Sequence, residues 1–251
     1  IEIPKSLEKC SNGYGYGQPT GIVGGVFQNC ANLKTVTFEE GTTEIAEGLF
    51  AGCTGIEQIK IPDTVTVIER GAFGGCINLT EIEIPDSVTE IETSAFGYCS
   101  SLKEIKLSEN LESMGAYAFE NCNVLKNIVI PDSVTNIGPD AFENCAELSN
   151  VILSKNLRTI GGYAFRNDNK LTEIEIPKSL EKCSNGYGYG QPTGIVGGAF
   201  QNCANLKTVT FEEGTTEIAE ALFAGCTGIE QIKIPNTVTV IERGAFGGCI
   251  N

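Results

Sequence analysis

Apolar and polar residues recur along this chain with a fixed period of 23 residues. Counted from Phe73, one unit reads FGGCINLTEIEIPDSVTEIETSA, and the next unit begins at Phe96. A strict period of this length predicts a solenoid of stacked units. The phenylalanines that mark the units form two runs, separated by one gap of 35 residues: Phe27, Phe50, Phe73, Phe96, Phe119, Phe142 and Phe165, then Phe200, Phe223 and Phe246.

Each unit predicts three short segments. The segment L-x-x-I-x-I-P, as at 79–85, alternates between inward and outward positions and ends at proline, which predicts a short strand. The segment V-x-x-I, as at 88–91, predicts a second short extended stretch with its apolar residues inward. The segment A-F-x-x-C, as at 95–99, predicts a turn, or one turn of helix, that places Phe and Cys in the core.

A longer period lies above the first. Residues 174–251 repeat residues 1–78 at an offset of 173, with three changes: Val26 to Ala199, Gly48 to Ala221 and Asp63 to Asn236. The sequence predicts a single solenoid domain over residues 1–251. It shows no polar capping unit, so we expect it to be a piece of a longer array that lacks any signal or anchor segment of the whole protein.

The cysteines predict a buried column rather than a metal site or a disulfide framework. Nine of the 11 follow a Phe by three residues, and neither a C-x-x-C pair nor a histidine occurs. Unpaired Cys is among the most frequently buried residue types. The common zinc-ligand spacings are absent, and no calcium-loop motif occurs. We therefore expect no metal and no cofactor.

Charge disfavours two classes of partner. Seventeen basic and 32 acidic residues give a net charge of −15, which repels nucleic acid and anionic lipid. No apolar run reaches the roughly 18 residues of a membrane helix, so membrane insertion is not expected.

The sequence offers no catalytic residues. Without histidine, the Ser-His-Asp and Cys-His arrangements are excluded. Glu81 and Glu83 have the residue type of a glycosidase pair, but neighbours two apart on an open strand lack an enclosing pocket, which favours a solvated charged face. We therefore expect the chain not to be an enzyme.

A glycine- and tyrosine-rich stretch, GYGYGQPTG, occurs twice, within inserts at about 11–25 and 184–198. No G-K-S/T and no helix signal follow it, which argues against a phosphate loop. The stretch predicts a projecting loop with four candidate contact residues, Tyr14, Tyr16, Tyr187 and Tyr189. An insertion that the solenoid merely tolerates, with its tyrosines packed on their own scaffold, is the open alternative.

A second candidate surface lies on the outward positions of the strands. These positions are mostly polar, but Val129 and Ile152 are adjacent and apolar, with Asn127 and Asn150 beside them. Exposed apolar patches with polar rims often mark partner sites. The open alternative is that β-branched residues are there because they suit strands.

The pattern C-x-x-L-x-x-I-x-I-P-x-x-V-x-x-I-x-x-x-A-F, at 76–96, closely resembles the 23-residue leucine-rich repeats of the BspA-like family. The resemblance implies a right-handed, β-rich α/β solenoid with a concave parallel sheet on one side and short turns or single helical turns on the other. The sequence departs from the pattern at Asp168, which replaces a column cysteine, and at Cys10 and Cys183, which precede the inserts.

Members of that family are mostly cell-surface or secreted proteins, and those studied act in adhesion. The resemblance therefore implies a non-enzymatic module that binds host or cell-surface proteins. The alternative is a structural spacer that holds another domain away from the cell, because near-identical 173-residue units add length without new chemistry.

Overall fold

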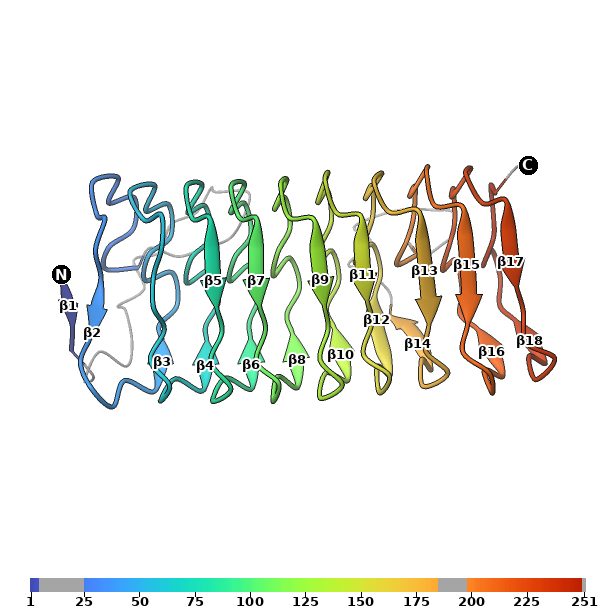
Figure 1. Cartoon of the computed structure of the whole chain (residues 1–251), viewed down its shortest axis with the longest axis horizontal. Helices are drawn as coiled ribbons and strands as arrows, with labels where there is room; N and C mark the ends of the chain where they lie inside the picture. The colour runs from blue at the N-terminus through green and yellow to red at the C-terminus, as the bar shows by residue number, and fades with distance from the viewer. Residues whose placement is uncertain (5–24, 185–197, 250–251) are drawn as a thin grey trace.

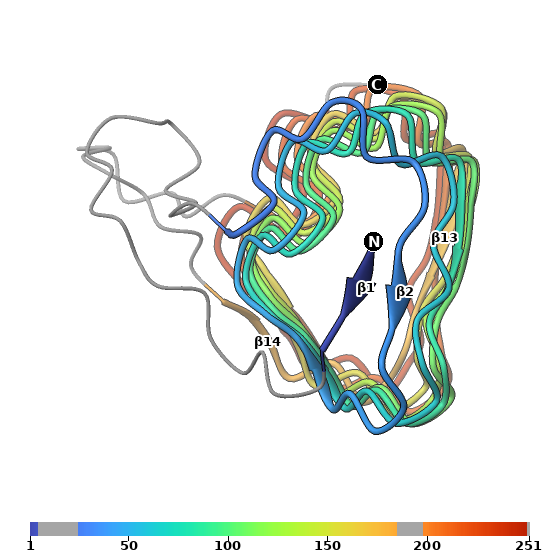
Figure 2. The ribbon, with the colours of Figure 1, turned by 90° about the vertical axis from the view of Figure 1, so that its left-hand side faces the viewer.

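The computed structural model describes residues 1–4, 25–184 and 198–249, which form one elongated stack of rungs (Figure 1). Seen along the stack, successive rungs superpose closely (Figure 2). The predicted β-rich solenoid is confirmed. Tyr14, Tyr16, Tyr187 and Tyr189 lie outside the described residues, so their predicted role in binding stays a prediction.

The L-x-x-I-x-I-P segments form the strands of one side of the stack, as predicted. Neighbouring strands pair in parallel at the 23-residue period, for example Glu81 with Glu104 and Asn127 with Asn150. The strands of this side are β1 (Glu2–Ile3), β2 (Thr37–Phe38), β5 (Glu81–Glu83), β7 (Glu104–Lys106), β9 (Asn127–Val129), β11 (Asn150–Ile152), β13 (Glu173–Ile176), β15 (Thr208–Phe211) and β17 (Gln231–Lys233).

The V-x-x-I segments form the strands of the other side, and this prediction is also confirmed. Seven of these strands make one parallel sheet in the order β14-β12-β10-β8-β6-β4-β3. The strands are β3 (Glu44–Ile45), β4 (Val67–Ile68), β6 (Glu90–Ile91), β8 (Ser113–Met114), β10 (Asn136–Ile137), β12 (Thr159–Gly161), β14 (Lys182–Ser184), β16 (Glu217–Ile218) and β18 (Val240–Ile241).

The phenylalanines form a continuous stacked column inside the solenoid. Neighbouring rings have centroids 5.1 to 6.0 Å apart and are tilted by no more than 19°. Each ring therefore lies about one strand spacing from the next. Aromatic rings bury a large apolar area, and eight of the ten are fully buried, so this column supplies much of the burial that stabilises the fold.

The cysteines form a second column beside the phenylalanines. The Sγ of Cys76 donates to the carbonyl oxygen of Phe50, one rung earlier, at 3.2 Å, and Cys99 does the same to Phe73 at 3.3 Å. Of the nine cysteines whose side chains are described, seven are buried, as predicted, and none is in a disulfide. The prediction is wrong for Cys30, which is exposed where the described column ends.

The A-F-x-x-C segments are turns, and the described parts of the chain contain no helix. From Phe50 to Phe165, and again at Phe223 and Phe246, each turn has a residue in the left-handed region two positions before Phe and another two positions after it, such as Ser94 (φ 55°) and Tyr98 (φ 63°) around Phe96. Two left-handed residues four apart interrupt any helix, because L-residues adopt that conformation singly. Asparagine or glycine therefore commonly follows at the second position, as in Asn121 and Asn144.

The insert after β14 does not interrupt the stack. On one side β13 pairs with β15 in register, Glu173 opposite Thr208, although 35 residues separate the two. The rings of Phe165 and Phe200 stay 5.1 Å apart. Cys183, which departs from the repeat pattern, lies in β14 opposite Ile160 of β12 and keeps the strand register.

Candidate binding surface

The outward residues of the L-x-x-I-x-I-P strands form one broad polar surface, which we call the strand face. The inward residues of these strands are buried or partly buried from β1 to β15, whereas outward residues such as Glu83 and Lys106 are exposed; in the last strand, β17, the inward Ile232 is also exposed. Each rung presents outward residues at three positions, at 80, 81 and 83 in the rung of β5 and at the equivalent positions of the other rungs, 23 residues apart or 35 across an insert. The regular period therefore arranges these side chains in three columns that run along the stack.

The predicted apolar pair lies together in the middle of the strand face. Val129 of β9 pairs with Ile152 of β11, and their exposed fractions are 56% and 52%. Asn127 and Asn150 pair in the same two strands, and both are exposed. We call these four residues the central window. They bring four uncharged side chains side by side where the neighbouring rungs carry charges.

The strand face is nearly neutral, although the whole chain carries a charge of −15. Seven lysines and eight glutamates occupy its outward positions, which gives 7 − 8 = −1 and leaves −14 for the rest of the chain. The residues counted are Lys34, Lys60, Lys103, Lys106, Lys126, Lys207 and Lys233 against Glu2, Glu57, Glu81, Glu83, Glu104, Glu173, Glu175 and Glu230. The acidity of this protein is therefore concentrated on its other surfaces.

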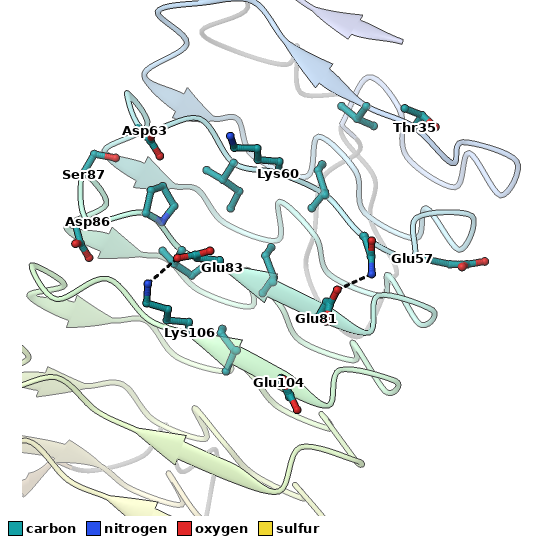
Figure 3. A pocket seen from close by; sticks show the side chains of 18 of the residues that line it. Thr35, Glu57, Lys60, Asp63, Glu81, Glu83, Asp86, Ser87, Glu104 and Lys106 are labelled. Carbon is teal, nitrogen blue, oxygen red and sulfur yellow. Dashed lines mark hydrogen bonds and ion pairs between the residues drawn. The ribbon is translucent and has the colours of Figure 1, made fainter.

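An open hollow of about 1500 Å³ lies on the strand face at its N-terminal end (Figure 3). The Nζ of Lys106 lies 2.6 Å from Oε1 of Glu83, and Gln58 donates to Glu81 across one rung at 2.5 Å. The pair of Lys106 with Glu83 therefore joins two neighbouring rungs. Lys60 forms no ion pair within the described part of the chain.

The geometry of Glu81 and Glu83 does not favour glycoside hydrolysis. Both carboxylates are exposed on the open face, and each has a partner, Gln58 for one and Lys106 for the other. A glycosidase needs one carboxyl kept protonated by an enclosed, apolar setting, which this face lacks.

A cluster on the turn side was not predicted from the sequence. Asp140 and Glu143 are buried there, and Arg166 from the next rung contacts both, with its Nε donating to Glu143 at 2.7 Å. Burial, together with a hydrogen bond to Glu143, raises the pKa of Asp140 to about 7. The guanidinium carbon of Arg166 lies 4.2 Å from the ring centroid of Tyr163.

In this turn-side cluster Arg166 pairs with both carboxyl groups and joins two rungs, which indicates a structural role. No group of metal-ligating residues suited to an ion occurs in the described ranges. The only signal for the cluster in the sequence is the change at the first position after Phe, from Gly97 to Glu120, Glu143 and Arg166 in successive units. The net charge of the strand face, by contrast, can be calculated from the sequence, because the repeat predicts which residues point outward.

The chain matches one family model, that of the BspA type leucine-rich repeat region. The match comprises six copies and extends over residues 20–148, 113–187 and 191–251. No curated protein matches the chain. The described residues include no helix long and apolar enough to cross a membrane.

The solved structures that are similar to this chain include three leucine-rich repeat proteins. A leucine-rich repeat protein from Bacteroides ovatus is 27% identical with a TM-score of 0.71, and the match covers 99% of this chain but 64% of that one. The leucine-rich repeat protein of T. pallidum is 28% identical with a TM-score of 0.57, over 67% of this chain and 76% of that one. A leucine-rich repeat protein from Eubacterium ventriosum shares the fold, with a TM-score of 0.62. It is 22% identical, and the match covers 88% of this chain and 72% of that one.

Proposed function

Because this chain belongs to the BspA-type leucine-rich repeat proteins, we propose that it is a non-enzymatic protein-binding and adhesion module of a cell-surface or secreted protein. Leucine-rich repeat domains generally bind proteins, and stacked repeats offer extended surfaces suited to large, shallow contacts. The proposed location of this protein at the cell surface or outside the cell rests on the family, whose members are mostly secreted or displayed on cells.

The observation that carries this proposal is the central window. Val129 and Ile152 expose apolar side chains in the middle of an open sheet side, within a rim of charged residues. An exposed apolar patch with a polar rim is typical of a partner site. The near-neutral strand face around it adds little local repulsion or attraction to an acidic or a basic protein in contact with it.

The test is binding of the chain to a panel of host extracellular-matrix proteins, plasma proteins and bacterial surfaces. We expect the double variant Val129→Glu, Ile152→Glu to lose at least tenfold in affinity for whichever partner the wild type binds. The matched control is Ile77→Glu, Thr135→Glu, which adds the same charge at exposed positions away from the strand face. Unchanged affinity of the window variant contradicts the assignment of the surface.

The glycine-tyrosine loops are tested in the same panel. A variant with serine in place of the four insert tyrosines, Tyr14, Tyr16, Tyr187 and Tyr189, distinguishes a binding loop from a tolerated insertion. The substitutions lower affinity if the loops contact the partner and leave it unchanged if the solenoid merely tolerates them. If the wild type binds nothing at micromolar concentration, a structural spacer becomes the better account of the 173-residue repeat.

A further inference from the structure

We propose that the strand face binds a second copy of this chain through the central window, as a two-fold symmetric pair. The inference rests on the proposed function, since it names the partner of the same surface. The two-fold axis runs parallel to the strands and lies midway between β9 and β11 of each copy. Two open sheets then pack face to face, at the usual separation of about 10 Å.

This symmetry brings like side chains together at the centre. The rotation reverses the order of the rungs but keeps the position along each strand, so β9 lies opposite β11 of the second copy. Val129 therefore meets the second copy's Ile152, and Asn127 meets the second copy's Asn150. Each apolar contact occurs twice, because the surface is the same on both copies.

In the column that contains Val129 and Ile152, the first charged residues on either side of the central window have opposite signs. Lys106 is one period before Val129, and Glu175 is one period after Ile152. The two-fold axis places Lys106 opposite the second copy's Glu175, again twice. Lys106 is already paired with Glu83 in its own chain, but both side chains are more than 65% exposed, and such surface pairs exchange at little cost.

Net charge also directs two copies toward this face. Copies that carry −15 each repel one another over most approaches. The strand face holds only −1 of that charge, so contact through it adds almost no local repulsion. Higher salt screens the long-range repulsion, and we therefore expect the pair to tighten or stay unchanged as salt rises.

One contact opposes the pairing and limits its strength. The same symmetry places Glu104 opposite the second copy's Glu173, one rung beyond the asparagines. About six rungs of strand face meet near the axis, roughly 30 Å by 20 Å, before the usual crossing angle of about 30° separates the outer rungs. That is roughly 600 Å² per copy, below the ~800 Å² of a standard interface, so we expect a weak dimer with a Kd of roughly 10 to 500 µM.

Sedimentation equilibrium of the full chain from 10 µM to 1 mM tests the proposal. We expect Val129→Glu, Ile152→Glu to weaken the dimer at least tenfold, while Ile77→Glu, Thr135→Glu leaves it within twofold. Lys106→Glu should weaken it at least threefold, and Lys106→Glu combined with Glu175→Lys should restore it. Glu104→Lys, which faces the second copy's Glu173, should tighten the dimer at least threefold.

A wild type that stays monomeric at 1 mM overturns the inference, and so does a dimer that the window variant leaves intact. A dimer that the window variant breaks but the charge exchange does not restore overturns the two-fold arrangement. If the chain is monomeric yet binds another protein through the central window, the self-pairing fails and the proposed function stands. If the chain dimerises but binds nothing in the panel, the partner is the second copy itself.

Discussion

The Oδ1 of Asp168 accepts the backbone N–H of Cys145, one rung earlier, at 2.9 Å. Asp168 occupies the position that holds cysteine in the nine other units and is completely buried. Its Oδ2 is buried as well and has no hydrogen-bond partner. Burial raises the pKa of this carboxyl well above its ordinary value, because it disfavours the charged form. A buried polar atom without a partner costs stability.

Replacing Asp168 with Cys should stabilise the protein. The new Sγ would donate to the carbonyl of Phe142, as the column cysteines do one rung earlier, and the unpartnered Oδ2 would be removed. We expect a gain of about 1 to 3 kcal/mol, the usual cost of one unsatisfied buried group. The midpoint of urea denaturation measures it. The reverse change, Cys122→Asp, should lower the midpoint, and a lower midpoint for Asp168→Cys would refute the explanation.

Stability should fall as the pH rises from 5 to 8. Between the ordinary carboxyl pKa of 3.8 and the higher pKa of buried Asp168, the folded chain keeps a proton that the unfolded chain releases, so each rise in pH favours unfolding. Asp140, with its pKa raised to about 7, acts in the same direction up to that pH. Each group contributes at most about 1.4 kcal/mol per pH unit.

The control for this pH dependence is Asp168→Asn, which cannot release a proton. The groups around Asp168 are Cys145, Cys203 and Glu143, and the pKa of each of the two thiols is raised well above its ordinary value, so they stay neutral over this range. Urea midpoints at pH 5, 6, 7 and 8 should decline less steeply for the variant. Parallel declines in both proteins would show that Asp168 does not cause the dependence.

The buried cysteines should resist thiol reagents in the folded protein. Burial raises the pKa of Cys53 to about 11 and that of Cys99 to about 12, and the thiolate is the reactive form. Among the nine cysteines described, we expect Cys30 to be alkylated first at pH 8, because it is exposed. Mass mapping after a short pulse provides the measurement, and labelling of Cys76 as fast as Cys30 would be inconsistent with the column.

Two glycines should differ strongly in their tolerance of alanine. Gly75 has φ +73°, but an added Cβ would meet nothing closer than 3.6 Å, so Gly75→Ala should cost about 1 to 2 kcal/mol from the backbone alone. At Gly161 an added Cβ would lie 2.1 Å from the backbone N of Pro139 in the neighbouring rung. Gly161→Ala should therefore lower the urea midpoint much further. Equal midpoints would contradict this close packing of rungs.

Much of the fold could be predicted from the 23-residue period, because inward residues repeat and therefore stack. The spacing of Phe73 and Phe96 was enough to predict the ring column, and that of Cys76 and Cys99 the thiol column. The sequence did not distinguish a turn from one turn of helix at the A-F-x-x-C segments. Asn121 at the second position after Phe indicates a left-handed residue, but Tyr98 at the equivalent position obscures that signal.

The candidate surface was predicted only in part. Val129 and Ile152 could be located because strand alternation fixes which residues point outward. The contact between Glu143 and Arg166 could not be predicted, because it depends on the conformations of two long side chains on the turn side of neighbouring rungs. The insert tyrosines carry no repeat pattern that would place them.

The most direct test of the central claim is photo-crosslinking from the strand face. A photoreactive benzoylphenylalanine at Val129 is compared with the same group at Ile77 on the turn side, each irradiated with a bound partner protein and, separately, alone at 500 µM. We expect crosslinks from position 129 to the partner and, for the chain alone, to the second copy's peptide that contains Ile152, with few from position 77. Equal crosslinking from both positions, or none from position 129, would contradict the assignment of the strand face as the binding surface.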